Sequence, residues 1–190
     1  MKKILVVDDE PIIRLDIRDM LEQSGYNVVA EAGDGFEAIQ LAQKHHPDIV
    51  IMDIKMPLLD GLTASKRIMA EDLTSGIILL TAYSDTKFIE KAKEFGASGY
   101  LIKPLNEGAL IPMVELSLAK GEEFKQMSQE IKKLNKKLSE RKTIEKAKGK
   151  LMDLENLTEE EAYQKIRTIS MEKRVPMIDI AETLVLIDER

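Results

Sequence analysis

Five short apolar runs, rich in β-branched residues, recur along the first hundred residues, with amphipathic helical patterns between them. Such runs predict buried strands, and strands that alternate with helices predict βαβ units, because parallel strands need crossover connections. Five units in roughly 115 residues predict an α/β fold with a five-stranded, parallel, doubly wound sheet. The runs are KILVVD (3–8), NVVAEA (27–32), DIVIMD (48–53), GIILLTA (76–82) and GYLIKP (99–104).

Polar residues stand at the carboxyl ends of four of these runs. Asp8 and Asp9 end the first, Asp53 the third, Thr81 the fourth and Lys103 the fifth. Ligands of open α/β sheets bind beyond the carboxyl ends of the strands. If the first and third runs are neighbours, three carboxylates lie together, and like charges that close favour binding of a cation. Carboxylate oxygens without His or Cys suit a hard ion, so we expect Mg²⁺.

Taken singly, these acids have a simpler interpretation. Asp8 and Asp9 would cap the helix that begins near Pro11, and Asp53 would cap a loop. Capping does not account for complementary polar residues at four strand ends, so we favour one shared site.

The segments VVDDE, IMDIKMPLLDG, LLTAYS and YLIKP resemble the motifs of bacterial two-component receiver domains, over about residues 1–118. The resemblance implies the flavodoxin-like strand order 2-1-3-4-5. It also implies that Asp53 accepts a phosphoryl group from a sensor histidine kinase. Mg²⁺ would be held by Asp9, Asp53 and the backbone carbonyl of Lys55, and Asp8 would act through water.

The same resemblance assigns roles to three further residues. Lys103 would pair with the phosphoryl oxygens, and Thr81 would move toward them. Tyr100 would turn inward on activation; the alternative is an ordinary half-buried strand aromatic. The Lys103–Pro104 peptide bond would be cis. The chemistry agrees, because an aspartate is a competent covalent acceptor and phosphoryl transfer mainly needs positioning and charge neutralisation.

After residue 112 the strand patterns end, and an apolar seam with 3-4-3-4 spacing follows. This spacing predicts a short coiled coil at residues 119–140, and hence a homodimer. Because two heptads are few, packing of a single helix on its own domain stays open, as does the oligomeric state without phosphorylation. The seam consists of Phe124, Met127, Ile131, Leu134 and Leu138.

Positive charge is concentrated in one block of an acidic chain. The net charge is −6, yet residues 124–150 hold 10 Lys and Arg against 3 Asp and Glu, or +7. Such a block predicts binding of a polyanion, or else a solvated helix face. By helical periodicity Lys142, Lys146 and Lys150 should share the side opposite the apolar stripe. The candidate contacts are Arg141, Lys142, Lys146, Lys148, Lys150, Arg167, Lys173 and Arg174.

Two further helices should complete a small bundle. Thr158 and Glu161 have the spacing of a capping box, and Pro176 suits the first turn of the last helix. Tyr163 is expected to face inward. Gly149 is unusual within a helix, and it would admit either a neighbouring helix near Tyr163 or a nucleic-acid backbone.

This half resembles the ANTAR family of RNA-binding antiterminator modules, over about residues 124–187. The resemblance implies a three-helix output at residues 141–190 that binds paired hairpins in nascent mRNA and prevents a terminator from forming. Lys and Arg would supply affinity for phosphates, and exposed loop bases would be read directly. The matching residues are Arg141, Ile144, Ala147, Lys148, Gly149, Leu151, Met152, Ala162, Tyr163, Arg167, Met171 and Ala181.

We therefore expect a phosphorylation-activated, dimeric antiterminator; among ANTAR regulators it is most similar to those of Gram-positive ethanolamine utilisation. A DNA-binding regulator is disfavoured, because the last predicted helix carries Asp179, Glu182, Asp188 and Glu189 against Arg190 alone. A protein-interaction adaptor with a solvated basic helix stays open. An enzymatic output is disfavoured because residues 119–190 lack His and Cys. Only self-catalysed aspartyl phosphorylation and hydrolysis would remain.

The composition limits the kinds of site this protein can have and the compartment in which it is expected. The chain has no cysteine, which excludes a disulfide framework and a thiolate metal site. No apolar run approaches the roughly 20 residues of a membrane helix, and the N-terminal run is too short for a signal peptide. We expect a cytoplasmic protein that does not bind membranes.

Overall fold

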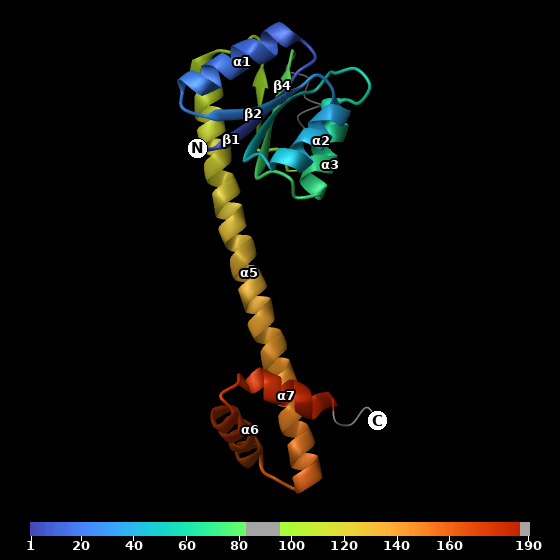
Figure 1. Cartoon of the computed structure of the whole chain (residues 1–190), viewed down its shortest axis with the longest axis vertical. Helices are drawn as coiled ribbons and strands as arrows, with labels where there is room; N and C mark the ends of the chain where they lie inside the picture. The colour runs from blue at the N-terminus through green and yellow to red at the C-terminus, as the bar shows by residue number, and fades with distance from the viewer. Residues whose placement is uncertain (83–95, 187–190) are drawn as a thin grey trace. The chain divides into compact units, whose positions relative to one another are not determined.

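The computed structural model describes residues 1–82 and 96–186 (Figure 1). The chain divides into two compact units, Met1–Gln126 and Met127–Arg190. Helix α5 (Glu107–Glu155) contributes residues to both units. The boundary between the units falls inside the segment predicted as a linker helix. Among the described residues, no helix has both the length and the apolar character needed to cross a membrane.

The first unit is built on a five-stranded sheet in the order β2-β1-β3-β4-β5, and all four neighbouring pairs are parallel. This confirms the predicted fold class and strand order. The predicted runs extend up to two residues beyond the strands, because terminal residues such as Asp8 and Lys103 already belong to loops. The strands are β1 (Lys3–Val7), β2 (Asn27–Ala32), β3 (Ile49–Asp53), β4 (Gly76–Thr81) and β5 (Gly99–Ile102).

Helices cover both faces of this sheet, as Figure 1 shows. Successive side chains of a strand point to opposite faces, so each strand contributes to two core layers. Leu5 and Val7 pack in one layer with α2 (Gly35–His45) and α3 (Gly61–Ala70). Ile4 and Val6 pack in the other layer with α1 (Pro11–Gln23) and the first turns of α5. This two-sided burial explains why the strands read as continuous apolar runs.

The second unit combines the C-terminal part of α5 with α6 (Glu159–Lys173) and α7 (Met177–Leu186). The predicted capping box is present: Thr158 caps α6, and the Glu161 carboxylate accepts a hydrogen bond from the Thr158 backbone N–H at 2.9 Å. Pro176 immediately precedes α7 and does not lie within its first turn. Among the described residues of this unit the core is small, with five buried apolar residues: Ala147, Leu151, Ala162, Ile166 and Ala181.

The prediction that Tyr163 faces inward is wrong, because 37% of its surface is exposed. Ala162 and Ile166 fill the inward face of α6, and Tyr163 lies about 100° around the helix from Ala162. The ring of Tyr163 therefore lies at the side of the helix and not in the core.

Candidate functional site

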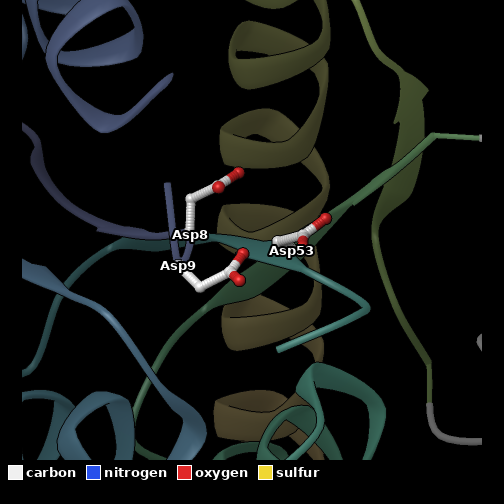
Figure 2. Close-up of side chains that lie close together, drawn as sticks. All are labelled: Asp8, Asp9 and Asp53. Carbon is white, nitrogen blue, oxygen red and sulfur yellow. The ribbon is translucent and has the colours of Figure 1, made fainter. Parts of the chain in front are cut away.

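Three carboxylates converge at the carboxyl edge of the sheet (Figure 2). Strands β1 and β3 are hydrogen-bonded neighbours, so Asp8 and Asp9, just past β1, lie beside Asp53 at the end of β3. One carboxylate oxygen from each residue lies within 4.8 Å of the other two. Asp8 is fully buried and Asp53 is 6% exposed, whereas Asp9 is exposed. The structure therefore brings together the three acids that the strand pattern placed at one site.

Lys103 joins this cluster from the end of β5. Its Nζ lies 2.6 Å from Oδ2 of Asp8 and 3.2 Å from Oδ1 of Asp53. The Lys103 backbone N–H donates to the carbonyl oxygen of Thr81 at 2.8 Å, which holds the two strand ends together. The Lys103–Pro104 peptide bond is cis, as expected. One ammonium group thus contacts both buried carboxylates.

The electrostatics of the cluster favour a further cation. Burial raises the pKa of Asp53 above its ordinary value; Lys103 opposes this rise, while Asp8 and Asp9 add to it. Burial alone lowers the pKa of Lys103, but the hydrogen bonds and charges of Asp8 and Asp53 together raise it. The lysine stays charged, and one positive charge faces three carboxyl groups. The donor set consists of hard oxygens, which Mg²⁺ prefers.

The capping interpretation holds in part for Asp8. Its Oδ1 accepts a hydrogen bond from the backbone N–H of Glu10 at 3.0 Å, and this closes the turn before α1. Glu10 itself makes no side-chain cap. Asp8 thus uses one carboxylate oxygen for the turn and the other for Lys103.

The loop that follows Asp53 is constrained by a glycine that the sequence reasoning missed. A Cβ on Gly61 would lie 1.8 Å from the backbone oxygen of Asp53, so no other residue fits there. The Gly61 N–H donates to the carbonyl of Ile54 at 3.0 Å, and Asp60 caps α3. The Asp-Gly pair in IMDIKMPLLDG was the available signal. Lys55 is exposed in this loop, and its carbonyl remains a predicted Mg²⁺ ligand.

Arg14 is a second residue that the sequence reasoning missed. Its Nη1 donates to the backbone oxygen of Asp8 at 2.6 Å, and its Nε lies 3.5 Å from Oε2 of Glu31. Glu31 also accepts a hydrogen bond from Arg18 at 2.8 Å. The bond to Asp8 joins α1 to the turn after β1. No local motif predicts the contact of Arg14 with Glu31, because Glu31 comes from the neighbouring strand β2.

The two predicted switch residues lie on adjacent strands. Thr81 ends β4 and is 7% exposed, and Tyr100 lies on β5 with 40% of its surface exposed. The partial exposure of Tyr100 is compatible with both interpretations, an ordinary half-buried strand aromatic and a side chain that turns inward on activation. The movements of both residues stay predictions. Tyr83 and Ser84 of the LLTAYS motif lie outside the described residues.

The predicted seam is exposed along α5. All five of its side chains have more than half of their surface open to solvent, from 51% for Met127 to 74% for Phe124. None belongs to a core cluster formed by the described residues. The described residues therefore supply no cover for this stripe, and the coiled coil and the packing of a single helix on its own domain both stay predictions.

The eight basic residues predicted to contact RNA separate into two groups. Six are exposed, whereas Lys148 is only 7% exposed and Lys150 is partly buried. Lys148 forms ion pairs of 2.8 Å with both Glu145 and Glu159, and Lys150 donates to the backbone oxygen of Val185 at 2.7 Å. The exposed six are Arg141, Lys142, Lys146, Arg167, Lys173 and Arg174.

These contacts correct the predicted basic face. Lys148 follows Ile144 by four residues and precedes Leu151 by three, so it lies on the core side of α5. Lys150 points toward the last carbonyls of α7, where a cation is favourable. The predicted exposed face therefore keeps Lys142 and Lys146 but loses Lys150. Glu145 and Glu159 raise the pKa of Lys148 by hydrogen bonding.

Gly149 has no packing role in the described structure. A Cβ at this position would have no other atom within 4 Å outside its own helix backbone and chain neighbours. A glycine inside a helix costs about 1 kcal/mol relative to alanine. Of the two explanations offered by the sequence, close approach of a neighbouring helix is wrong.

Comparisons with known proteins agree with both halves. Residues 4–115 match the family model of the response regulator receiver domain, and residues 132–185 match that of the ANTAR domain. The transcriptional regulatory protein PdtaR of Mycobacterium tuberculosis is 39% identical over 183 residues, which cover 96% of this chain and 89% of PdtaR.

Solved structures resemble the first unit. The chemotaxis protein CheY4 of Vibrio cholerae is 33% identical with a TM-score of 0.57, covering 60% of this chain and 97% of CheY4. A chain from the CheX–CheY–BeF3–Mg²⁺ complex of Borrelia burgdorferi is 28% identical with a TM-score of 0.57, covering 60% of this chain and 86% of that one.

Proposed function

The chain belongs to the two-component response regulators that join a receiver domain to an ANTAR domain, and from this premise we propose that phosphorylation of Asp53 switches on a dimeric, RNA-binding antiterminator. The observation that carries the proposal is the cluster of Asp8, Asp9, Asp53 and Lys103. We divide the functions as receiver (1–118), coiled-coil linker (119–140) and RNA-binding output (141–190).

The acidic cluster fits a phosphoacceptor site. A carboxylate oxygen of Asp53 would bond to phosphorus while the bond from phosphorus to the histidine nitrogen of the kinase breaks. Lys103, already 3.2 Å from Asp53, would pair with the phosphoryl oxygens, and Thr81 would move toward them. Hydrolysis would return the phosphoryl group to water.

The same cluster fits Mg²⁺. Asp9, Asp53 and the backbone carbonyl of Lys55 would hold the ion, and Asp8 would contact it through water. Bound Mg²⁺ would neutralise charge on the phosphoryl group during transfer. The CheY complex from Borrelia burgdorferi, whose fold this unit shares, is named as containing BeF3 and Mg²⁺.

Dimerisation would bury the exposed seam. Apolar side chains that repeat every three and four residues favour a sister helix with the same pattern, because burial of apolar surface stabilises association. Phosphorylation would favour this dimer.

The exposed basic residues of the output would supply affinity for RNA phosphates. A dimer carries two outputs, so it would hold two hairpins at once and gain affinity without new contacts. Both partners, the cytoplasmic part of a kinase and nascent mRNA, place this function in the cytoplasm. Binding of the hairpins would prevent a terminator from forming.

The test compares the native full-length chain with its Asp53→Asn variant on a two-hairpin RNA, with and without a small-molecule phosphodonor, across a salt series. We expect the phosphodonor to strengthen both RNA binding and dimerisation in the native chain, with a steep salt dependence, and to leave the variant unchanged. Equal RNA affinity and an equal dimerisation constant with and without phosphodonor in the native chain would refute the switch.

A protein-interaction adaptor is the second candidate. The internal pairing of Lys148 and Lys150 favours it, because it reduces the free positive charge on α5. An RNA-free partner complex that does not depend on salt would support the adaptor. A DNA-binding output has less support, since the described part of α7 carries Asp179 and Glu182 and no basic residue. Asp188, Glu189 and Arg190 lie outside the described residues.

A further inference from the structure

Gly149 occupies the interior of a helix without a packing reason. Where packing requires glycine in this chain, an added Cβ would meet close neighbours: on Gly61 it would lie 1.8 Å from the Asp53 backbone oxygen, and on Gly121 it would lie 2.9 Å from Cβ of Ser75. At Gly149 no atom of the described residues lies within 4 Å of the corresponding position, apart from the chain neighbours and the backbone of the same helix. Glycine in a helix interior is unfavourable relative to alanine. The open space therefore points to a group from outside the chain.

The surroundings of Gly149 on α5 are basic. At roughly 100° per residue, Lys142 and Lys146 lie within about 60° of Gly149, on the side away from Ala147 and Leu151. Both lysines are exposed. Asp153, also exposed, lies one turn beyond Gly149 and limits the basic surface at that end.

Helix α6 continues this surface. A short connection joins α5 to α6, so the two helices form an antiparallel hairpin, in which Lys148 bonds to Glu159 at 2.8 Å. Tyr163 is 37% exposed, and Arg167 follows it by four residues on the same side of α6. Both Gly149 and Tyr163 lie within roughly two helical turns of the connecting loop.

Helix geometry places these residues on one face of the hairpin. In an antiparallel pair, residues rotated in the same sense from the buried positions emerge on the same face. Gly149 lies about 150° around α5 from the middle of its buried positions Ala147, Lys148 and Leu151. Tyr163 and Arg167 lie about 80° and 120° around α6, in the same sense, from the middle of Ala162 and Ile166. Lys150 is rotated in the opposite sense and reaches α7 through Val185. The open face is therefore the one away from α7.

We propose that RNA crosses α5 at Gly149 and that an unpaired base stacks on Tyr163. This rests on the proposed RNA-binding function and defines its contact surface. The absent Cβ lets the ribose-phosphate backbone approach the helix, while Lys142 and Lys146 neutralise phosphates. The ring of Tyr163 offers a stacking surface to an unpaired loop base, and Arg167 supplies a second cation beside it. The surface offers positive charge, an exposed aromatic ring and room for a close backbone. The ligand that matches these three features is a single-stranded RNA loop, which carries phosphates and an unpaired base.

The experiment uses the full-length chain with Mg²⁺ and BeF3⁻ and a pool of two-hairpin RNAs with randomised loops. RNAs retained by the native chain are isolated, and their dissociation constants are measured for Gly149→Ala and for Thr168→Ala. Thr168 is exposed on α6 outside the proposed face, and its replacement equally favours helix. We expect both variants to unfold at a higher temperature. Only Gly149→Ala should bind RNA more weakly, by about tenfold, as expected for one overpacked methyl group.

Three further variants test the partners of Gly149. Tyr163→Ala should weaken binding by about 5- to 150-fold, whereas Tyr163→Phe should retain it, because phenylalanine also stacks. Lys142→Gln combined with Lys146→Gln should lower the salt dependence by about one unit of slope per lysine. Lys125→Gln, exposed and far along α5, is the matched charge control and should leave the slope unchanged.

The outcomes separate this inference from the proposed function. If the native chain retains RNA and Gly149→Ala binds as tightly as Thr168→Ala, the Gly149 contact is wrong while the RNA-binding function stands. Equal losses in Tyr163→Phe and Tyr163→Ala would overturn the stacking role. If the native chain retains no RNA above a protein-free control, both the function and this inference fall.

Discussion

At the scale of single residues, the lysines of the output unit have two kinds of role: some stabilise the fold and others are exposed to solvent. Lys148 is enclosed by two carboxylates, Lys150 reaches a helix C-terminus, and Lys142 and Lys146 stay in water. The core of this unit has five buried apolar residues, so ion pairs between its helices matter more than in the receiver. Positive charge on α5 is therefore partly structural.

We expect Lys148→Met to lower the unfolding temperature of the output unit near neutral pH. Lys148 has a pKa raised above 10.5 and Glu159 a pKa lowered below 4.5, mainly through their mutual hydrogen bond and that of Lys148 with Glu145. The stabilisation from Glu159 is present above its unfolded pKa and is lost as the pH falls through the lower folded value. That from Lys148 is present below its unfolded pKa and is lost as the pH rises through the raised folded value.

The difference between native chain and variant should thus be largest between these limits and shrink at both extremes. Thermal unfolding followed by circular dichroism from about pH 3 to about pH 11, a range that extends beyond both ordinary pKa values, measures this. Lys146→Met, exposed on the same helix, is the control and should show no such profile. A constant difference at every pH would mean that the methylene stem, not the charge, stabilises the unit.

Arg14 acts on the acidic cluster through the backbone of Asp8. Its removal would leave the Asp8 carbonyl without this donor and loosen the turn that carries Asp8 and Asp9. We expect Arg14→Ala to weaken Mg²⁺ binding by about 10- to 100-fold, the usual effect of losing an outer-shell partner, and Arg14→Lys to restore part of it.

Calorimetric titration with Mg²⁺ measures the Arg14 effect directly. Arg18→Ala is the matched control, because Arg18 shares Glu31 with Arg14 but is not bonded to Asp8 in the described contacts. An equal loss in both variants would assign the effect to the Glu31 network and not to the bond with Asp8.

At the scale of elements, α5 combines three tasks along one continuous helix. Leu110 and Val114 belong to the receiver core, the exposed seam follows, and Ala147 and Leu151 belong to the output core. The middle stretch of α5 exposes five apolar side chains that no core cluster of the described residues covers. Its apolar stripe is the element-scale reason to expect a second copy.

We expect Leu134→Asn to weaken the phosphorylated dimer without unfolding the chain, since this side chain is 58% exposed. Each buried leucine contributes roughly 1.5–3 kcal/mol, and a dimer loses two of them. Sedimentation equilibrium with a phosphodonor measures the dimerisation constant. Lys136→Asn, exposed on the same helix outside the seam, should dimerise as the native chain does, and equal dimerisation by Leu134→Asn would exclude the seam.

At the scale of the whole molecule, the two units differ in how they are held together. The receiver buries two apolar layers, one on each face of its sheet, whereas the output has a single small core. Burial of apolar area dominates stability, so the output should unfold at a lower temperature than the receiver. A marginal output unit suits a module that is stabilised further when it binds RNA or a second copy.

Local sequence patterns determined much of this protein. The apolar runs, the acids at their ends, the seam and the Thr158–Glu161 capping box each depend on neighbours a few residues away, so periodicity and spacing sufficed to predict them. Tertiary structure alone decided that Tyr163 is exposed, that Lys148 is enclosed, that Lys150 meets Val185 and that Arg14 reaches Glu31. Those outcomes depend on which distant elements pack together and how closely, and an alanine-lined core or a neighbouring strand leaves no local periodicity in the chain.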